Sequence, residues 1–144
     1  MLDIILISGG FDPIHSGHIK LINEAKKHGE IVVLLNSDEW LRNKKGKEFL
    51  PINERKIIMM NIKGVIDVIE FDDSDQTCID GIKKANSLFK NRVIKFANGG
   101  DRNNNTTPEK KYCDDNNIES LFGIGGSNKS NSSSWILKKW KDNN

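Results

Sequence analysis

The sequence predicts an α/β fold: a single doubly wound domain with a five-stranded parallel sheet and helices on both faces. Three observations lead to this prediction. Short apolar runs alternate with segments of helical apolar spacing along the chain. The runs are apolar at consecutive positions, as in strands that are covered on both faces. The length of 144 residues suits one domain, residues 1–144, better than two.

The N-terminal part of the chain predicts a parallel strand–helix–strand unit. Residues 2–8 are a β-branched apolar run closed by Gly9 and Gly10, which is typical of a buried strand. Residues 16–27 have helical apolar spacing and stop before Gly29, and residues 31–35 form a second apolar run. A helix between two apolar strands predicts a right-handed crossover.

The rest of the chain continues the alternation after one irregular stretch. Residues 36–51 are polar, lysine-rich and without period, so we expect a mobile surface loop there. Asn53 is the expected N-cap of the next helix. The further expected helices lie at residues 53–59, 75–89, 108–116 and 135–141, and the further expected strands at residues 65–71, 93–97 and 118–122.

Composition excludes several classes of protein. The net charge of +2 is too small to indicate binding to nucleic acid or to a membrane surface. Cys78 and Cys113 are the two cysteines, and they form neither a disulfide framework nor a zinc-binding pattern. No basic leader opens the sequence, and no apolar stretch reaches the roughly 18 residues of a membrane span. We therefore expect a soluble, cytoplasmic protein.

Polar and glycine residues that carry chemistry follow several predicted strands, so they should meet at one edge of the sheet. After the first strand, Gly9 and Gly10 let backbone N–H groups approach a ligand closely. His15 and His18 are three residues apart at a helix start, with Gly17 between them. A helix N-terminus favours anions, and two imidazole donors there predict a nucleotide phosphate site.

Two alternatives explain the histidines without a nucleotide. They would be surface residues on a polar helix end, or a metal pair. A metal pair lacks a third ligand nearby, because His28 lies at the far end of the same helix. The glycines fit neither the dinucleotide fingerprint nor the Walker A pattern.

Residues Gly9 to His18 (GGFDPIHSGH) match the (G/T)xFDxxHxGH signature, and the chain therefore resembles the cytidylyltransferase-like nucleotidyltransferases. That group includes glycerol-3-phosphate cytidylyltransferases and heptose-1-phosphate adenylyltransferases. The resemblance implies a Rossmann-like nucleotidyltransferase domain in which His15 and His18 stabilise the α-phosphate. It also implies nucleotide contacts from Gly9, Gly10, Phe11, Asp12 and Gly17.

Further segments resemble landmarks of the same group in the same order. Asn53-Glu54-Arg55-Lys56 resembles a segment whose arginine binds phosphate, which makes Arg55 a candidate catalytic residue. The loop lysine that closes over the triphosphate corresponds to Lys45, with Lys44 as the second candidate. The resemblance also implies nucleotide contacts from six residues after later strands: Asn98, Gly100, Asp101, Ser132, Ser133 and Ser134.

Explanations without ligand binding stay open for several of these residues. The lysines fit a solvated loop, Arg55 fits a helix-surface charge, and Asp101 fits simple turn chemistry. The serine run also fits an N-cap, a role compatible with phosphate binding. Asp12 either contacts the ligand or braces the turn.

The resemblance implies transfer of a nucleoside monophosphate from CTP to a small phosphorylated polyol or sugar, with release of pyrophosphate. ATP-dependent adenylyl transfer to a sugar phosphate and a non-catalytic nucleotide-binding module are the alternatives. Arginines of the glycerol-3-phosphate type are absent at Gly64 and around Lys129, whereas the Gly99-Gly100-Asp101 turn is closer to the heptose-phosphate type. Mg²⁺ is expected on the nucleotide phosphates rather than in a protein metal site, and a homodimer is expected from the resemblance.

Overall fold

The computed structural model describes residues 1–99, 107–124 and 133–142, without the side chains of residues 98, 99 and 134. Its centre is a five-stranded parallel sheet with the strand order β3-β2-β1-β4-β5. The strands are β1 (Ile4–Gly9), β2 (Glu30–Leu35), β3 (Val65–Glu70), β4 (Ile94–Gly99) and β5 (Glu119–Ile124). The helices are α1 (Ser16–Ala25), α2 (Asp38–Lys45), α3 (Ile52–Met60), α4 (Ile79–Leu88), α5 (Pro108–Asp115) and α6 (Ser133–Asp142). The predicted fold class is confirmed.

The two faces of the sheet carry separate cores, because successive strand residues point to opposite sides. On one face, Ile4 and Leu6 of β1 pack in a cluster with Ile82 of α4 and Cys113 of α5. On the other face, Ile5 and Ile7 pack in a cluster that includes Ile22 of α1 and Met59 of α3. Helices therefore cover both faces, and this explains why the central strands are apolar at consecutive positions.

The strand order places the ends of β1 and β4 side by side. The chain runs outward from β1 through β2 to β3, and then returns to pair β4 with β1, Leu6 lying opposite Phe96. The order reverses between these two strands, and a doubly wound sheet binds its ligands in the crevice at that point. The segment that follows β1, with both histidines, opens onto this crevice.

The expectation of an irregular loop at residues 36–51 is wrong in its first half, because α2 occupies Asp38–Lys45. The Ser37 side chain caps it by accepting from the Trp40 N–H at 3.1 Å. Acidic residues fill its first turn and basic residues its last turn, and Gly46 ends it with a φ of +89°. These end signals were present in the sequence, but only Leu41 of this helix is buried, so apolar periodicity did not reveal it.

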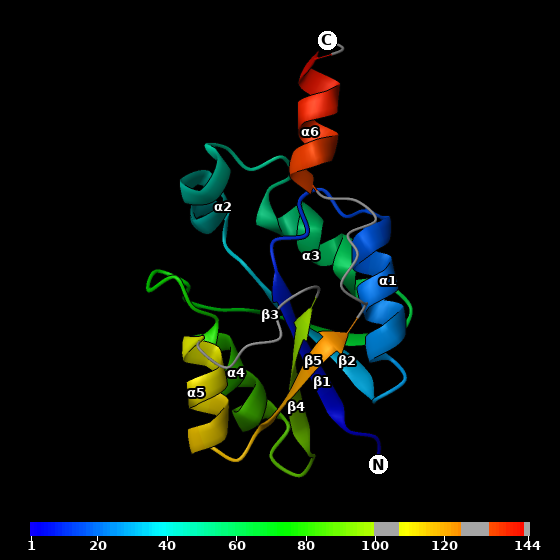
Figure 1. Cartoon of the computed structure of the whole chain (residues 1–144), viewed down its shortest axis with the longest axis vertical. Coiled ribbons are helices and arrows are strands. Elements are labelled where there is room, and N and C mark those ends of the chain that lie inside the picture. Colours follow the sequence, from blue (N-terminus) through cyan, green and yellow to red (C-terminus); the bar gives the residue numbers. More distant parts are fainter. Residues whose placement is uncertain (100–106, 125–132, 143–144) are drawn as a thin grey trace.

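The other helices differ from their expected bounds at their ends. Helix α3 begins after Pro51 as N-cap rather than after Asn53, and α4 begins at Ile79 rather than at residue 75. Helices α2 and α6 stand beyond the sheet on the side where the strands end (Figure 1). Among the helices in the described part of the chain, none combines the length and apolarity that crossing a bilayer requires.

Candidate active site

His15 and His18 are held by a reciprocal hydrogen-bond pair at the start of α1. The Nδ1 atom of His15 accepts from the Gly17 backbone N–H at 3.0 Å, and the Nδ1 atom of His18 accepts from the His15 backbone N–H at 3.2 Å. The two rings stack with their centroids 3.8 Å apart. Histidine thus takes both places of the capping box that Ser or Thr and Glu more often fill.

This arrangement fixes the tautomer of both rings. A neutral imidazole carries one N–H, and a nitrogen that accepts a hydrogen bond cannot carry it. The proton of each neutral ring is therefore on Nε2, on the far side of the ring from the backbone bond. Two N–H donors side by side, at the N-terminus of a helix, suit the oxygens of a phosphate.

The surroundings of His18 keep its ring neutral. Burial, with smaller electrostatic contributions from the neighbouring His15 and Lys45, lowers the pKa of His18 to about 3. The edge of the ring also contacts Phe11, with ring centroids 4.8 Å apart. At neutral pH His18 is an uncharged hydrogen-bond donor.

Asp12 braces the turn and connects it to the segment after α2. Its carboxylate accepts from the backbone N–H groups of Phe49 at 2.6 Å and Leu50 at 2.7 Å, and the residue is only 2% exposed. The same carboxylate lies 3.4 Å from the Lys45 ammonium, which also donates to the Asp12 backbone carbonyl. The structure thus brings Lys45 to the histidine turn, and it gives Asp12 the bracing role.

Arg55 is buried beneath the site rather than on a helix surface. It is 1% exposed, and its guanidinium donates to the carbonyls of Leu50, Gly10 and Asn36 at 2.8–3.0 Å. It also pairs with Asp38 at 2.6 Å. Four segments of the chain meet on this one side chain, and a contact to phosphate would require one of these bonds to break.

The glycines at the end of β1, Gly9 and Gly10, admit neighbouring side chains. A Cβ on Gly10 would lie 2.7 Å from a methyl carbon of Leu41, so the missing side chain lets α2 approach the end of β1. A Cβ on Gly9 would lie 3.2 Å from the Phe11 ring. Phe11 itself has a φ of +51°, a conformation that bulky residues rarely adopt and that clusters at functional sites.

The later candidate residues are placed in part. Ser133 begins α6, and its hydroxyl donates to the Pro13 carbonyl at 2.7 Å, two residues before His15. Gly100, Asp101 and Ser132 lie outside the described residues, as do the side chains of Asn98 and Ser134. Lys45 contacts Asp12, whereas the Lys44 ammonium lies over the Trp40 ring, 4.7 Å from its centroid.

Several polar residues that hold the site together were missed by sequence reasoning. Asp73, which follows β3, accepts from the Asn36 amide at 3.0 Å, and from the backbone N–H and hydroxyl of Ser37 at 2.8 and 2.7 Å. Asp38 pairs with Arg55. No motif marks these residues, and the available signal was their place directly after β2 and β3. In the described part of the chain, no three metal-ligating side chains gather.

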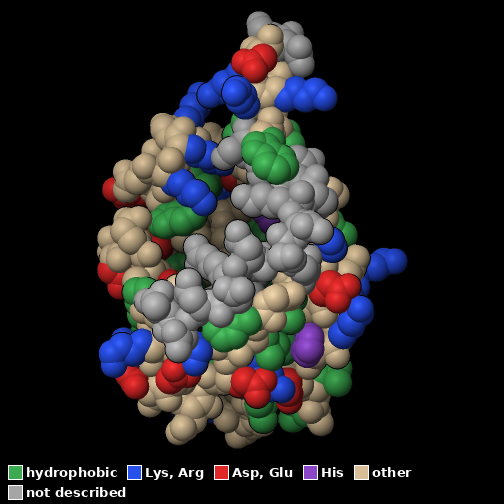
Figure 2. All heavy atoms as spheres, viewed as in Figure 1, with side chains coloured by type: hydrophobic (Ala, Val, Ile, Leu, Met, Phe, Trp, Pro, Cys, Tyr) green, Lys and Arg blue, Asp and Glu red, His purple; other side chains and the backbone are tan. Residues whose placement is uncertain are grey.

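On the face shown in Figure 2, the molecule is hollowed near its middle, and Lys and Arg side chains gather above the hollow. The sheet order defines a doubly wound α/β domain, and the two histidine rings lie beyond the end of β1, where such domains bind ligands. The family model described as cytidylyltransferase-like matches residues 6–122, and the chain belongs to this family.

Individual relatives are similar over shorter stretches. The bifunctional protein HldE of Psychromonas ingrahamii is 34% identical over 71 residues, which are 47% of this chain and 15% of that protein. Glycerol-3-phosphate cytidylyltransferase of Bacillus subtilis is 38% identical over 66 residues, 45% of this chain and 51% of that enzyme. The chain thus spans about half the length of the cytidylyltransferase and a far smaller part of the HldE protein.

A solved structure supports the fold. The lipopolysaccharide core biosynthesis protein from Thermoplasma volcanium superposes with a TM-score of 0.64 at 24% identity, covering 85% of this chain and 94% of that one.

Proposed function

We propose that this protein transfers a nucleoside monophosphate from CTP to a small phosphorylated polyol or sugar and releases pyrophosphate. The observation that carries the proposal is the histidine pair, which offers two Nε2–H donors beside Lys45 at the end of β1. An oxygen of the acceptor phosphate attacks the α-phosphorus of the nucleotide in line. As that P–O bond forms, the bond from the α-phosphorus to the bridging oxygen breaks, and its electron pair leaves with pyrophosphate.

The acceptor phosphate is already an anion, so the reaction needs no protein nucleophile. Catalysis then depends on position and on stabilising the charge of the α-phosphate oxygens as the phosphorus becomes five-coordinate. His15 and His18 donate to these oxygens, and Lys45 exchanges its contact with Asp12 for the triphosphate. Arg55, Ser133 and Ser134 are the candidates for the β- and γ-phosphates. Mg²⁺, held by the nucleotide phosphates, supplies further charge neutralisation.

Turnover assays test this proposal directly. Purified protein is mixed with Mg²⁺, CTP or ATP, and a panel of polyol and sugar phosphates, and pyrophosphate release is followed. We expect release with CTP and at least one acceptor. ATP is the second donor to examine, because the relatives include both HldE proteins and a cytidylyltransferase. No release with any pair would contradict the enzymatic proposal for that panel.

A second candidate is a nucleotide-binding module without turnover. The observation in its favour is the absence of the two arginine features of the glycerol-3-phosphate type, at Gly64 and around Lys129. A thermal-shift comparison of CTP, ATP, GTP and UTP with Mg²⁺ measures which nucleotide the protein binds, whether or not it turns over. A bound ligand raises the apparent stability by mass action. A large shift without pyrophosphate release would favour the module.

The homodimer implied by the resemblance also stays a prediction. Light scattering after gel filtration measures the mass in solution, and a mass of twice 16.3 kDa would support it.

A further inference from the structure

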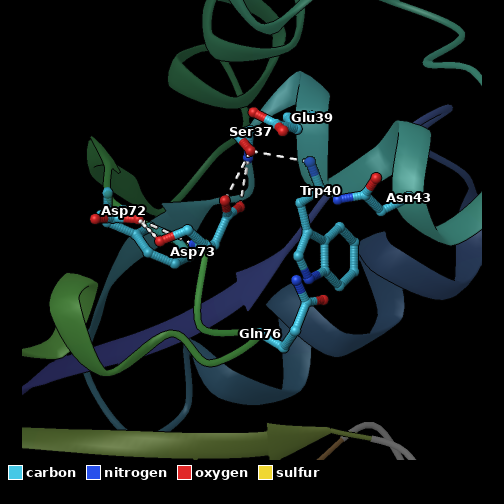
Figure 3. A pocket seen from close by; sticks show the side chains of 9 residues that line it. Ser37, Glu39, Trp40, Asn43, Asp72, Asp73 and Gln76 are labelled. Carbon is cyan, nitrogen blue, oxygen red and sulfur yellow. Dashed lines mark hydrogen bonds between the residues drawn. The ribbon is translucent and has the colours of Figure 1, made fainter.

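Helix α2 is held mainly by contacts at its two ends rather than by packing along its length. Leu41 is its one buried residue. The flank that carries Trp40 and Asn43 meets a cavity of about 290 Å³, which lies between α2 and the segment that follows β3 (Figure 3). Because this flank is not packed against other side chains, the direction of the helix depends on the contacts at its start and its end.

The start of α2 is fixed by Asp73, which follows β3. Its Oδ2 atom accepts from the Ser37 backbone N–H at 2.8 Å and from the Asn36 amide at 3.0 Å. Its Oδ1 atom accepts from the Ser37 hydroxyl at 2.7 Å, and the residue is only 6% exposed. A negative charge is favoured at a helix N-terminus, where backbone N–H groups are unpaired. Asp73 thus holds the two residues that precede α2.

The Ser37 hydroxyl connects Asp73 to the first turn of the helix. Its proton is donated to Asp73, which leaves a lone pair of the oxygen for the Trp40 backbone N–H at 3.1 Å. Figure 3 shows both bonds meeting at this one side chain. Asp73 therefore orients the N-cap side chain, and the N-cap determines where the first turn begins.

The other end of α2 carries Lys45. Its ammonium donates to the Asp12 backbone carbonyl and lies 3.4 Å from the Asp12 carboxylate. The helix has eight residues. Such a helix is about 12 Å long, so a tilt of about 10° at the cap would move the lysine by about 2 Å. A displacement of about 1 Å at a reacting group costs on the order of 10²-fold in rate.

We propose that Asp73 and Ser37 are positioning residues, which set the direction of α2 and thereby place Lys45 at the histidine turn. The proposal rests on the nucleotidyltransferase function proposed above, in which Lys45 meets the triphosphate. Neither Asp73 nor Ser37 touches a substrate in this role. Both act through the helix on the lysine at its far end.

The reactivity of Lys45 measures its placement without turnover. A limiting amount of acetic anhydride acylates the full chain, and mass spectrometry compares Lys45, whose side chain is 17% exposed, with Lys111, whose side chain is 80% exposed. Ser37→Ala should raise Lys45 labelling about fivefold, the factor that corresponds to the loss of one N-cap. Ser37→Thr keeps the hydroxyl and should retain the labelling of the unaltered protein. Equal labelling of Lys45 in Ser37→Ala and Ser37→Thr would overturn the proposal.

Variants of the carboxylate test the other partner. Asp73→Ala should raise Lys45 labelling as Ser37→Ala does. Asp75→Ala is the matched control, because Asp75 is an exposed residue of the same segment that accepts from the backbone N–H and hydroxyl of Thr77. It should leave Lys45 labelling unchanged. Circular dichroism shows which variants are folded, and the two Ser37 variants decide the question if Asp73→Ala does not fold.

A double-mutant cycle separates positioning from a general loss of stability. Ser37→Ala should lower kcat on the order of tenfold in the unaltered protein. It should have little further effect in Lys45→Ala, because the group that it positions is then missing. Sites at opposite ends of a helix of this length otherwise act additively. The same loss in both backgrounds would show that Ser37 does not act through Lys45, and would overturn the proposal.

The two proposals fail differently. Increased Lys45 labelling in Ser37→Ala, without pyrophosphate release from any pair in the unaltered protein, supports the positioning of Lys45 and refutes the transferase. Pyrophosphate release together with unchanged Lys45 labelling in Ser37→Ala supports the transferase and refutes the positioning.

Discussion

The two histidines of the turn after β1 each use the Nδ1 atom for structure, which places the N–H of each neutral ring on Nε2. The Nδ1 atoms accept from the Gly17 and His15 backbone N–H groups, which holds both rings in place before any ligand arrives. Such preorganised donors act on developing charge without a reorganisation cost at the moment of reaction. Removing one ring removes both a cap and a donor.

Replacement of His18 tests the donor role. His18→Ala should lower kcat on the order of 10²-fold or more, because a donor to the α-phosphate is lost in the transition state. The control is His28→Ala, an exposed histidine in the turn after α1, which should stay within twofold. A near-normal kcat in a folded His18→Ala protein would refute the role.

The protonation of His18 gives a second test. Burial holds its pKa at about 3 in the folded state, below the usual value of 6.5. As pH falls through 6.5, the unfolded chain takes up the proton and the folded chain does not, so this residue lowers stability between pH 6.5 and 3. Above pH 6.5 its contribution is fully present.

Nitrogen-15 NMR of the side chain measures this directly. The His18 ring should stay in the neutral Nε2–H form down to pH 4.5 in the folded protein, and should titrate near 6.5 in urea. Protonation near pH 6 in the folded state would contradict the buried environment.

At the scale of elements, α2 is held by polar bonds rather than by an apolar face. Leu41 is its one buried residue, whereas Ser37, Asp38 and Lys45 tie it to Asp73, Arg55 and Asp12. Arg55 joins α2 to the ends of β1 and β2 and to the segment before α3. The position of the lysine-bearing helix therefore depends on a buried cation.

Arg55→Lys should lower the free energy of unfolding by about 2–4 kcal/mol. A lysine cannot reproduce four bonds in the geometry of a guanidinium, and it leaves buried acceptors and the Asp38 carboxylate poorly paired. Urea denaturation followed by circular dichroism measures the change. Lys56→Ala, which breaks only an exposed pair with Glu70, should change it by less than about 1 kcal/mol. Equal effects would show that Arg55 is not a structural hub.

The sequence predicted elements wherever burial produced a periodic pattern. Strands β1 to β5 were all anticipated, because their residues are apolar on the buried faces. Helix α2 was missed because its stabilisation comes from caps, charges at its ends and long-range bonds, which leave no apolar period. The start of α3 was misplaced because Asn53 is a better cap residue than Pro51, the residue that takes the place.

The site was predictable where a contiguous motif carries it. The spacing predicted that His15 and His18 share one side of a helix start, and the family resemblance implied Lys45 or Lys44 as the lysine near them; the structure brings Lys45 to this turn. The burial of Arg55 was not predictable, since its partners Gly10, Asn36 and Asp38 come together only through the sheet order. The cavity at Trp40 was likewise invisible, because it joins the ends of two strands that are far apart in the sequence.

At the scale of the whole molecule, the cysteines report on opening of the core. Cys78, at the start of α4, and Cys113, on α5, are free and buried in the same core cluster. Burial raises the pKa of Cys78 to about 12 and that of Cys113 to about 11. A thiol reagent needs an exposed thiolate. We expect no alkylation of the native protein over hours at pH 8, and rapid alkylation of both thiols in urea. Modification of either cysteine without denaturant, detected by mass spectrometry, would show that this layer opens locally.

Helix α2 has one further consequence, which concerns how a ligand at its end acts on its start. Ser37 and Asp38 tie the start of the helix to Asp73 and Arg55, and Lys45 at its end contacts Asp12. A ligand that drew Lys45 away from Asp12 would therefore pull on a helix that is anchored at its other end. Thermodynamic linkage makes such an effect reciprocal: a change that loosens the anchors at Asp73 and Arg55 alters the affinity for the ligand by the same factor by which the ligand alters the anchoring equilibrium.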